Sequence, residues 1–374
     1  MRSADLLDPE RFRPSWPRLT YRLRLPRAHR GEARSKAGCA FLGSEYAIMG
    51  GAMSWVSNHT LVAAICNAGG FGVLASGALS PAELDFEIAA TRAGTDRPFG
   101  VNLITFDQNL AGQLEVCLDR RVSHIVLGGG LPSAELIAAA KRAGARILCF
   151  AASLQMGQRA IRNGAEALIV EGHEAGGHVG PVSTNVLVQE MMPLMGEVPV
   201  FVAGGIGRGE MIAHFIALGA AGCQLGTRFV CARESRVHPR VKAAYIRASA
   251  RDATLSPQLD PRFRIIPVRA IANKATAAFI EKQREAIVRY QRKEISLAEA
   301  QAEIETFWAG RLRRAVFDGD AEYGSLMAGQ SVGFVTREES VREIIEQLVD
   351  EAETAYTPPL LPGLNLPWRT AASA

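Results

Sequence analysis

Short apolar runs alternate with longer amphipathic segments between about residues 46 and 225. Strands that are covered on both faces lose the polar alternation of half-exposed strands, so we interpret these runs as buried parallel strands. Eight are expected, near residues 46–50, 72–75, 98–103, 123–128, 146–150, 167–171, 198–203 and 222–225.

The segments between the runs carry the start and stop signals of helices. Ser80-Pro81-Ala-Glu83 combines an N-cap serine, a proline in the first turn and a capping-box glutamate. Glycines at positions 69, 94, 144, 164 and 219 are typical of helix ends. Strand–helix units that repeat at spacings of about 20–30 residues predict an α/β fold, a (β/α)8 TIM barrel. A doubly wound open sheet is the alternative.

The pattern changes after about residue 235, where several prolines precede two charged segments with apolar stripes, Lys274–Arg292 and Ser296–Phe317. We expect both to be helices of a subdomain inserted beside or over the barrel mouth, and the amphipathic segment Glu338–Glu353 to close the barrel. The predicted division is a flexible, basic N-terminal extension (1–40), the barrel (41–235), a mainly helical subdomain (236–322), a chain return with the closing helix (323–357) and a loose tail (358–374).

Composition excludes several classes of protein. A net charge of +4 with acidic residues throughout does not favour nucleic-acid binding. No apolar run approaches the roughly 20 residues of a membrane span, and residues 1–36 lack the apolar core of a secretory signal. The six cysteines contain no C-x-x-C pair, which indicates reduced core thiols in a cytoplasmic protein. Composition does not fix the oligomeric state, and a homodimer remains one alternative.

Glycine-rich turns follow the seventh and eighth expected strands. Gly204 and Gly205 come after the seventh strand, and Gly226 and Thr227 after the eighth. In (β/α)8 barrels these two turns often hold a phosphate on backbone N–H groups, and glycine lets the phosphate approach. The alternative is that they are ordinary tight turns. A phosphorylated cofactor such as FMN is the interpretation we favour.

Another candidate site lies after the sixth strand, in the stretch Glu171-Gly-His-Glu-Ala-Gly-Gly-His-Val-Gly180. Its glycines, Gly177 among them, are interpreted as backbone that a ligand can approach closely. The two histidines are five residues apart and paired glycines precede the second, so the zinc-binding H-E-x-x-H helix does not fit and no metal is predicted. We expect His178 to act as acid, base or hydrogen-bond donor, with a structural histidine as the alternative.

Other candidates lie at the ends of the first and third strands. Met53 and Trp55 could wall a flat ring, although core packing is equally consistent with them. Asn102 could bond the polar edge of a ring. The remaining histidines in strand, helix or loop contexts, His59, His124, His214 and His238, are expected to have structural or solvated roles.

With these residues assembled, the chain resembles the FMN-dependent family that contains nitronate monooxygenases, formerly 2-nitropropane dioxygenases, and the flavin-type enoyl-acyl-carrier-protein reductase II. The resemblance spans nearly everything from 45 to 355. The matching stretches include Ile48-Met-Gly-Gly-Ala-Met-Ser-Trp-Val56, Pro98-Phe-Gly-Val-Asn102, Glu171-Gly-His-Glu-Ala-Gly-Gly-His178, Ala203-Gly-Gly-Ile206, Leu225-Gly-Thr-Arg-Phe229 and Met327-Ala-Gly-Gln-Ser-Val-Gly333.

The resemblance implies FMN at the C-terminal mouth of the barrel and assigns residues to it. His178 matches the active-site histidine of the family. Backbone contacts to the flavin would come from Gly51, Ala52 and Met53, bonds to the ring or ribityl chain from Asn102 and Glu171, and the phosphate site from Gly204, Gly205, Gly226 and Thr227, with Met327 and Gln330 near the ring. The first motif departs from the family pattern: Ala47, Gly50 and Ala52 stand where it has proline, glutamine and glycine.

The family contains two chemistries, and the motifs favour the reductase. We expect hydride to pass from NADH or NADPH through FMN to an activated acceptor such as an enoyl thioester. The nearest alternative is oxidation of alkyl nitronates with oxygen, with His178 as base. The other is a non-catalytic FMN-binding subunit that docks an acyl carrier protein on Arg233, Arg236 and Arg240.

Overall fold

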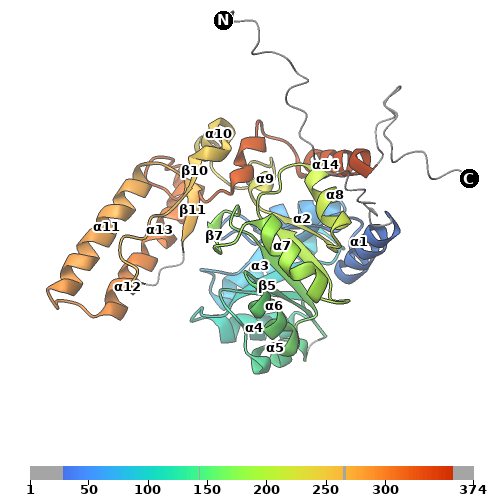
Figure 1. The fold of residues 1–374 in the computed structure, drawn as a ribbon, viewed down its shortest axis with the longest axis horizontal. Helices are drawn as coiled ribbons and strands as arrows, with labels where there is room; N and C mark the ends of the chain where they lie inside the picture. Colours follow the sequence, from blue (N-terminus) through green and yellow to red (C-terminus); the bar gives the residue numbers. More distant parts are fainter. Residues whose placement is uncertain (1–27, 143, 264–266, 357–374) are drawn as a thin grey trace, which may run out of the picture.

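Eight parallel strands close into a barrel in chain order (Figure 1). The computed structural model describes residues 28–142, 144–263 and 267–356. The barrel strands are β1 (Ile48–Gly50), β2 (Phe71–Ala75), β3 (Gly100–Ile104), β4 (His124–Gly128), β5 (Arg146–Ala151), β6 (Ala167–Glu171), β8 (Val200–Ala203) and β9 (Gly222–Leu225). Each overlaps an apolar run predicted as a strand, which confirms the TIM barrel and excludes the open sheet.

Helices surround the barrel on its outer face (Figure 1). They are α2 (His59–Asn67), α3 (Pro81–Gly94), α4 (Leu110–Asp119), α5 (Ala134–Lys141), α6 (Leu154–Arg162), α7 (Thr184–Met191), α8 (Gly209–Ala217) and α14 (Val341–Tyr356). The predicted capping box is present at α3, where Ser80 and Glu83 each bond the other's backbone N–H. Because α14 packs against both α8 and α2, it takes the place of the eighth barrel helix.

The N-terminal end of the barrel is covered by helix α1 (Ala28–Leu42). Leu42 is fully buried with the side chains that fill the barrel interior, among them Phe71 and Phe201. His124 Nε2 lies 2.8 Å from the carbonyl oxygen of Phe41. The prediction of a flexible extension over 1–40 is therefore wrong for residues 28–40, because the apolar end of this helix completes the core. Residues 1–27 and the predicted tail at 358–374 lie outside the described residues.

A long insertion separates β9 from α14. After α9 (Thr227–Val230) it contains α10 (Pro239–Arg247), η3 (Ala250–Asp252), β10 (Ala253–Leu255), β11 (Val268–Ile271), α11 (Lys274–Gln291), α12 (Leu297–Glu305), α13 (Phe307–Arg313), η4 (Arg314–Asp318) and η5 (Gln330–Phe334). Its helices build a separate small core around Phe279 and Trp308 and extend away from the barrel (Figure 1). The insertion is thus helical in its outer part, with two strands where it meets the barrel.

The segment predicted as one helix over Ser296–Phe317 is divided. Helix α12 ends at Glu305, and α13 begins at Phe307. The Thr306 hydroxyl donates to the carbonyl oxygen of Ala302 at 2.8 Å. This type of bond competes with the helical backbone pattern and bends or interrupts helices.

A buried ion pair fastens the end of the insertion to the barrel. Arg228 of α9 lies 3.0 Å from Glu339, and side-chain exposures of 2% and 7% remove both from water. Arg228 also donates to Gln347 of α14 at 2.9 Å. Among the described residues, no helix is long and apolar enough to cross a bilayer.

Replacing Glu339 with alanine should lower the free energy of unfolding by about 3–5 kcal/mol, because it leaves the Arg228 guanidinium buried without its counter-charge. Urea denaturation followed by circular dichroism measures this. The matched control is Glu281→Ala, which breaks an exposed pair with Arg284 and should leave the denaturation midpoint unchanged. Equal midpoints for the two variants would contradict a stabilising role of the buried pair.

Candidate active site

The predicted active-site histidine lies on a short strand at the C-terminal mouth of the barrel. After β6 ends at Glu171, residues Gly177 and His178 form β7, which pairs antiparallel with β11 of the insertion. Val268 is the register partner of His178, and Arg269 that of Gly177. This strand could not be predicted from the sequence, because two residues carry no periodic signal and their partner is distant in the chain.

Arg269 connects the same loop to the insertion through its side chain. Its guanidinium donates to the carbonyl oxygen of His173 at 3.2 and 3.1 Å, and to that of Ala253 in β10 at 2.7 Å. The residue is only 4% exposed, and desolvation lowers its pKa. The loop after β6 is therefore held both by the backbone pairing of β7 with β11 and by the side chain of the buried Arg269.

The two histidines of the stretch have different surroundings. His173 Nδ1 lies 2.9 Å from the Gly180 carbonyl oxygen, so this ring closes the loop on itself. The His178 ring makes no hydrogen bond with the described residues and remains solvent-accessible. Protein atoms nevertheless enclose it enough for desolvation to lower its pKa. At neutral pH the imidazole is neutral, with one nitrogen to donate and one to accept.

Glu171 contributes a second titratable group, at the end of β6. Its carboxyl makes no hydrogen bond with the described residues, and desolvation raises its pKa to about 8. The side chain is enclosed by protein atoms yet keeps partial access to the mouth. A carboxyl in this state is protonated at neutral pH and can donate a hydrogen bond to a ligand.

The turns after β8 and β9 have the features of an anion site. Gly204 and Gly205 have φ of 99° and 74°, a conformation that favours glycine. Among the described residues, no acceptor takes the backbone N–H groups of Gly204, Gly205, Gly226 or Thr227. Consecutive unpaired amides of this kind bind phosphate.

The chain return of the insertion joins these turns to the loop after β6. The Thr227 hydroxyl accepts from Gly329 N at 3.0 Å, and the Glu174 carbonyl oxygen accepts from Gln330 N at 2.9 Å. Met327 lies three residues before Gln330, and its carbonyl oxygen accepts from the Tyr245 hydroxyl at 2.7 Å. The structure thus brings Met327 and Gln330 to the same region as the predicted phosphate turn.

The turn after β1 brings Gly51 beside a buried residue that the sequence analysis missed. Gly51 N donates to Leu225 O at 2.9 Å, and Ser57 Oγ accepts from Met53 N at 3.0 Å. A Cβ on Gly51 would lie 3.2 Å from the Gln224 amide. Gln224 Oε1 is buried without a hydrogen-bond partner among the described residues. Only the fold shows that this amide, at the end of β9, faces the first turn.

Two further predicted residues surround the same opening. Asn102 is buried, and its amide donates to the Val126 carbonyl oxygen at 2.9 Å, which leaves its own oxygen free to accept. Ala52 is half-buried against the side chains of the barrel interior. That Asn102 and Ala52 contact a ring of the cofactor stays a prediction.

Two glycines of the stretch after β6 have a role other than the predicted one. A Cβ on Gly172 would lie 2.0 Å from the Thr184 hydroxyl oxygen, and one on Gly176 would lie 2.5 Å from Gly329 N. These glycines permit close packing of protein backbone. The interpretation that they open the loop to a ligand is wrong for both, whereas Gly177, with a φ of 76°, has space beside it.

The donor set fits FMN better than a metal. Within the described ranges, no group of three His, Cys, Asp or Glu side chains could hold a metal ion. Unpaired amides in two glycine turns suit a phosphate, and the orphaned Gln224 oxygen suits an N–H of a flat heterocycle. A buried acceptor without a partner is costly, so a ligand that donates to it would remove that cost.

Comparisons with known proteins agree with this fit. The family model described as nitronate monooxygenase matches residues 36–113 and 104–351. The chain is 35% identical over 221 residues, 59% of its length and 62% of the relative, to a (3aS,4S,5R,7aS)-5-hydroxy-7a-methyl-1-oxo-octahydro-1H-indene-4-carboxyl-CoA dehydrogenase of Rhodococcus jostii. The Mycobacterium tuberculosis protein of the same name is 29% identical over 84% of this chain and 94% of its own. The solved structure of FabK, an enoyl-ACP reductase II, from Thermotoga maritima has a TM-score of 0.77 and 35% identity, covering 86% of this chain and 97% of its own.

Replacing Glu171 with glutamine should change how stability depends on pH. In the wild type the folded pKa of about 8 lies above the ordinary glutamate pKa of 4.5, so unfolding releases a proton and stability falls as pH rises between these values. The variant has no such proton, and its unfolding free energy should gain on the wild type across this window and not below it.

Denaturant titrations of flavin-free protein at pH 4.5, 6 and 8 measure this difference. Glu115→Gln, on an exposed position of α4, is the control and should follow the wild type at every pH. A difference between Glu171→Gln and the wild type that stays constant with pH would show that the Glu171 carboxyl is ionised in the folded protein.

Proposed function

Because the chain belongs to the nitronate monooxygenase family, whose members are FMN-dependent oxidoreductases, we propose that it is an NAD(P)H-dependent reductase of an activated, thioester-linked acyl acceptor. FMN supplies the two-electron chemistry between the nicotinamide donor and the acceptor. The protein's own residues would hold the cofactor, orient the acceptor and deliver the proton to it.

The observation that carries this proposal is the position of a neutral imidazole at the barrel mouth. His178 is held by the β7–β11 pairing, close in the chain to the protonated carboxyl of Glu171. Reduction of an enoyl thioester adds hydride to one alkene carbon and a proton to the other. A neutral imidazole can donate a hydrogen bond to the thioester carbonyl without carrying a charge into the site, and it can deliver the proton to carbon only after taking one from solvent, so that it returns to the neutral ring.

The remaining contacts exclude water and place the cofactor. The amides of Gly204, Gly205, Gly226 and Thr227 would bind the phosphate, and Asn102 and Gln224 would accept from the ring or the ribityl chain. Met327 and Gln330 arrive with the insertion, so they would border the site on the side of the acceptor.

The substrate class is supported by the relatives rather than by the barrel. The dehydrogenases named above act on a carboxyl-CoA compound, and the structural neighbour FabK is an enoyl-ACP reductase. Both handle acyl groups bound as thioesters.

A carrier protein docked on the arginines considered earlier has less support. Arg233 pairs with Glu343 at 3.2 Å, and Arg236 with Glu87 at 3.1 Å. Two of these three arginines therefore already have carboxylate partners, and the cluster offers little free positive charge to an acidic protein.

Nitronate oxidation is the second candidate, because it is the activity for which the family is named. There the substrate reduces the flavin, oxygen reoxidises it, and His178 acts as base. A neutral imidazole can act as the base of this reaction as well as the hydrogen-bond donor of the other, so the donor of electrons has to be identified by experiment.

Anaerobic mixing of the FMN-loaded protein with NADH, NADPH or an alkyl nitronate distinguishes these candidates. We expect the absorbance of the bound flavin at about 450 nm to bleach when a reduced nicotinamide is added. It should return on addition of an enoyl thioester. Bleaching by the nitronate alone would reject the reductase and support the second candidate.

Replacing His178 with alanine should leave the flavin content unchanged and slow acceptor turnover about 10²–10⁴-fold, the range for a lost general acid or base. The nicotinamide half-reaction should change far less. His214→Ala, an exposed position on α8, is the matched control. Loss of bound flavin from the His178 variant would instead assign the residue a structural role.

A further inference from the structure

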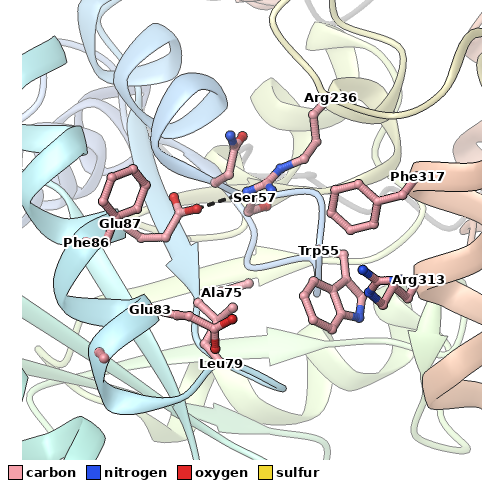
Figure 2. Close-up of a pocket in the computed structure, with 12 residues that line it drawn as sticks. Trp55, Ser57, Ala75, Leu79, Glu83, Phe86, Glu87, Arg236, Arg313 and Phe317 are labelled. Atoms are coloured by element: carbon pink, nitrogen blue, oxygen red, sulfur yellow. Dashed lines mark hydrogen bonds and ion pairs between the residues drawn. The ribbon is translucent and has the colours of Figure 1, made fainter.

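A pocket of about 450 Å³ opens between the barrel and the insertion, apart from the residues assigned to FMN. Its walls are Trp55 from the turn after β1, Phe86 and Glu87 from α3, Arg236, and Arg313 and Phe317 from the insertion (Figure 2). Sites for small organic ligands span about 300–1,000 Å³. The pocket is therefore large enough for a ligand of nucleotide size.

Aromatic rings and a guanidinium group meet at one side of the pocket. Trp55 and Phe317 lie edge to face, with centroids 5.9 Å apart. The Arg313 guanidinium carbon lies 5.9 Å from the Trp55 centroid and 5.3 Å from that of Phe317. Figure 2 shows the three side chains gathered together, across the pocket from α3. Flat bases stack on such surfaces.

The charges of the pocket are unequally satisfied. Arg236 pairs with Glu87 at 3.1 Å, and the same carboxylate accepts from His59 N at 2.7 Å. Glu83 accepts from the backbone and hydroxyl of Ser80. No carboxylate of the described residues pairs with Arg313, an exposed residue whose contacts are the two rings. Arg313 is thus the cation that remains available to an anionic ligand.

Trp55 has an unusual backbone conformation. Its φ is 66°, in the left-handed region that tryptophan rarely adopts. A residue in this conformation is held there by its surroundings, and such residues cluster at ligand sites. The conformation directs a large ring into the pocket just after Gly51 and Met53, which are assigned to the cofactor.

We propose that this pocket binds the adenine nucleotide arm of a substrate, with the base stacked on Trp55, the Phe317 ring against its edge and a phosphate on Arg313. The inference rests on the proposed function, because two reactants of that reaction carry such an arm: a coenzyme A thioester, with a 3′-phosphate, and NADPH, with a 2′-phosphate. An acyl group on a carrier protein has no adenine and would leave the pocket unused.

Binding of 3′,5′-ADP and of 2′,5′-ADP to the FMN-loaded protein, measured by isothermal titration calorimetry, tests the proposal. One of the two probes should bind. Preference for 3′,5′-ADP identifies the coenzyme A arm, and preference for 2′,5′-ADP identifies the NADPH arm. Failure of both to bind would overturn the proposal.

Variants locate the bound probe. Arg313→Ala should weaken binding about tenfold or more, as expected for a lost charge-assisted hydrogen bond, whereas Arg313→Lys should retain part of the affinity. Trp55→Ala should weaken binding and Trp55→Phe should not, because phenylalanine keeps a stacking face. Arg284→Ala, on the exposed side of α11, is the control and should bind like the wild type.

Unchanged affinity in both Arg313→Ala and Trp55→Ala would overturn the assignment to this pocket. Flavin content, measured for every variant, shows that the fold is intact. The two proposals fail separately: a protein that binds the probe but is not reduced by any nicotinamide retains the pocket and loses the proposed reaction. One that catalyses the reaction without binding either probe retains the reaction and loses the pocket.

Discussion

The site depends on the pairing of two short strands that lie far apart in the chain. Gly177 and His178 belong to the loop after β6, and without β11 that glycine-rich backbone would have no ladder to hold it. The buried Arg269 adds three hydrogen bonds from the same strand, two to the loop and one to β10. The insertion therefore sets the position of the histidine, and the barrel supplies the sequence on which it lies.

The proposed cofactor site is likewise built from both the barrel and the insertion. The barrel offers free amides in the turns after β8 and β9, and the insertion returns through Gly329 and Gln330, which bond Thr227 and Glu174. The buried pair of Arg228 and Glu339 fastens this return to the barrel. A change in the insertion would thus be transmitted to the phosphate turn and the β6 loop together, because both contact the same segment.

The sequence predicted the repeating part of the fold well and the long-range part poorly. Apolar runs and capping signals such as Ser80 and Glu83 are local, so the strands and helices of the barrel could be identified from them. The strand at His178, the orphaned amide of Gln224 and the packing of Gly172 against Thr184 depend on partners distant in the chain. The first helix was missed because its apolar end becomes informative only when a barrel interior lies above it.

The separation between groups of the barrel and groups of the insertion bears on why one barrel fold serves several chemistries. The unpaired amides and the buried acceptor proposed to recognise the cofactor are properties of the strand ends. Discrimination between acceptors requires groups that are satisfied by one substrate and left unpaired by another. Of the groups proposed above for this role, Arg313, Phe317 and the strand β11 that pairs with His178 come from the insertion, and Trp55 comes from the barrel. On the proposal made above, changes at Arg313, Phe317 or β11 would alter the choice of substrate, whereas changes at Gly329 or Gln330 would also reach the turns of the cofactor site.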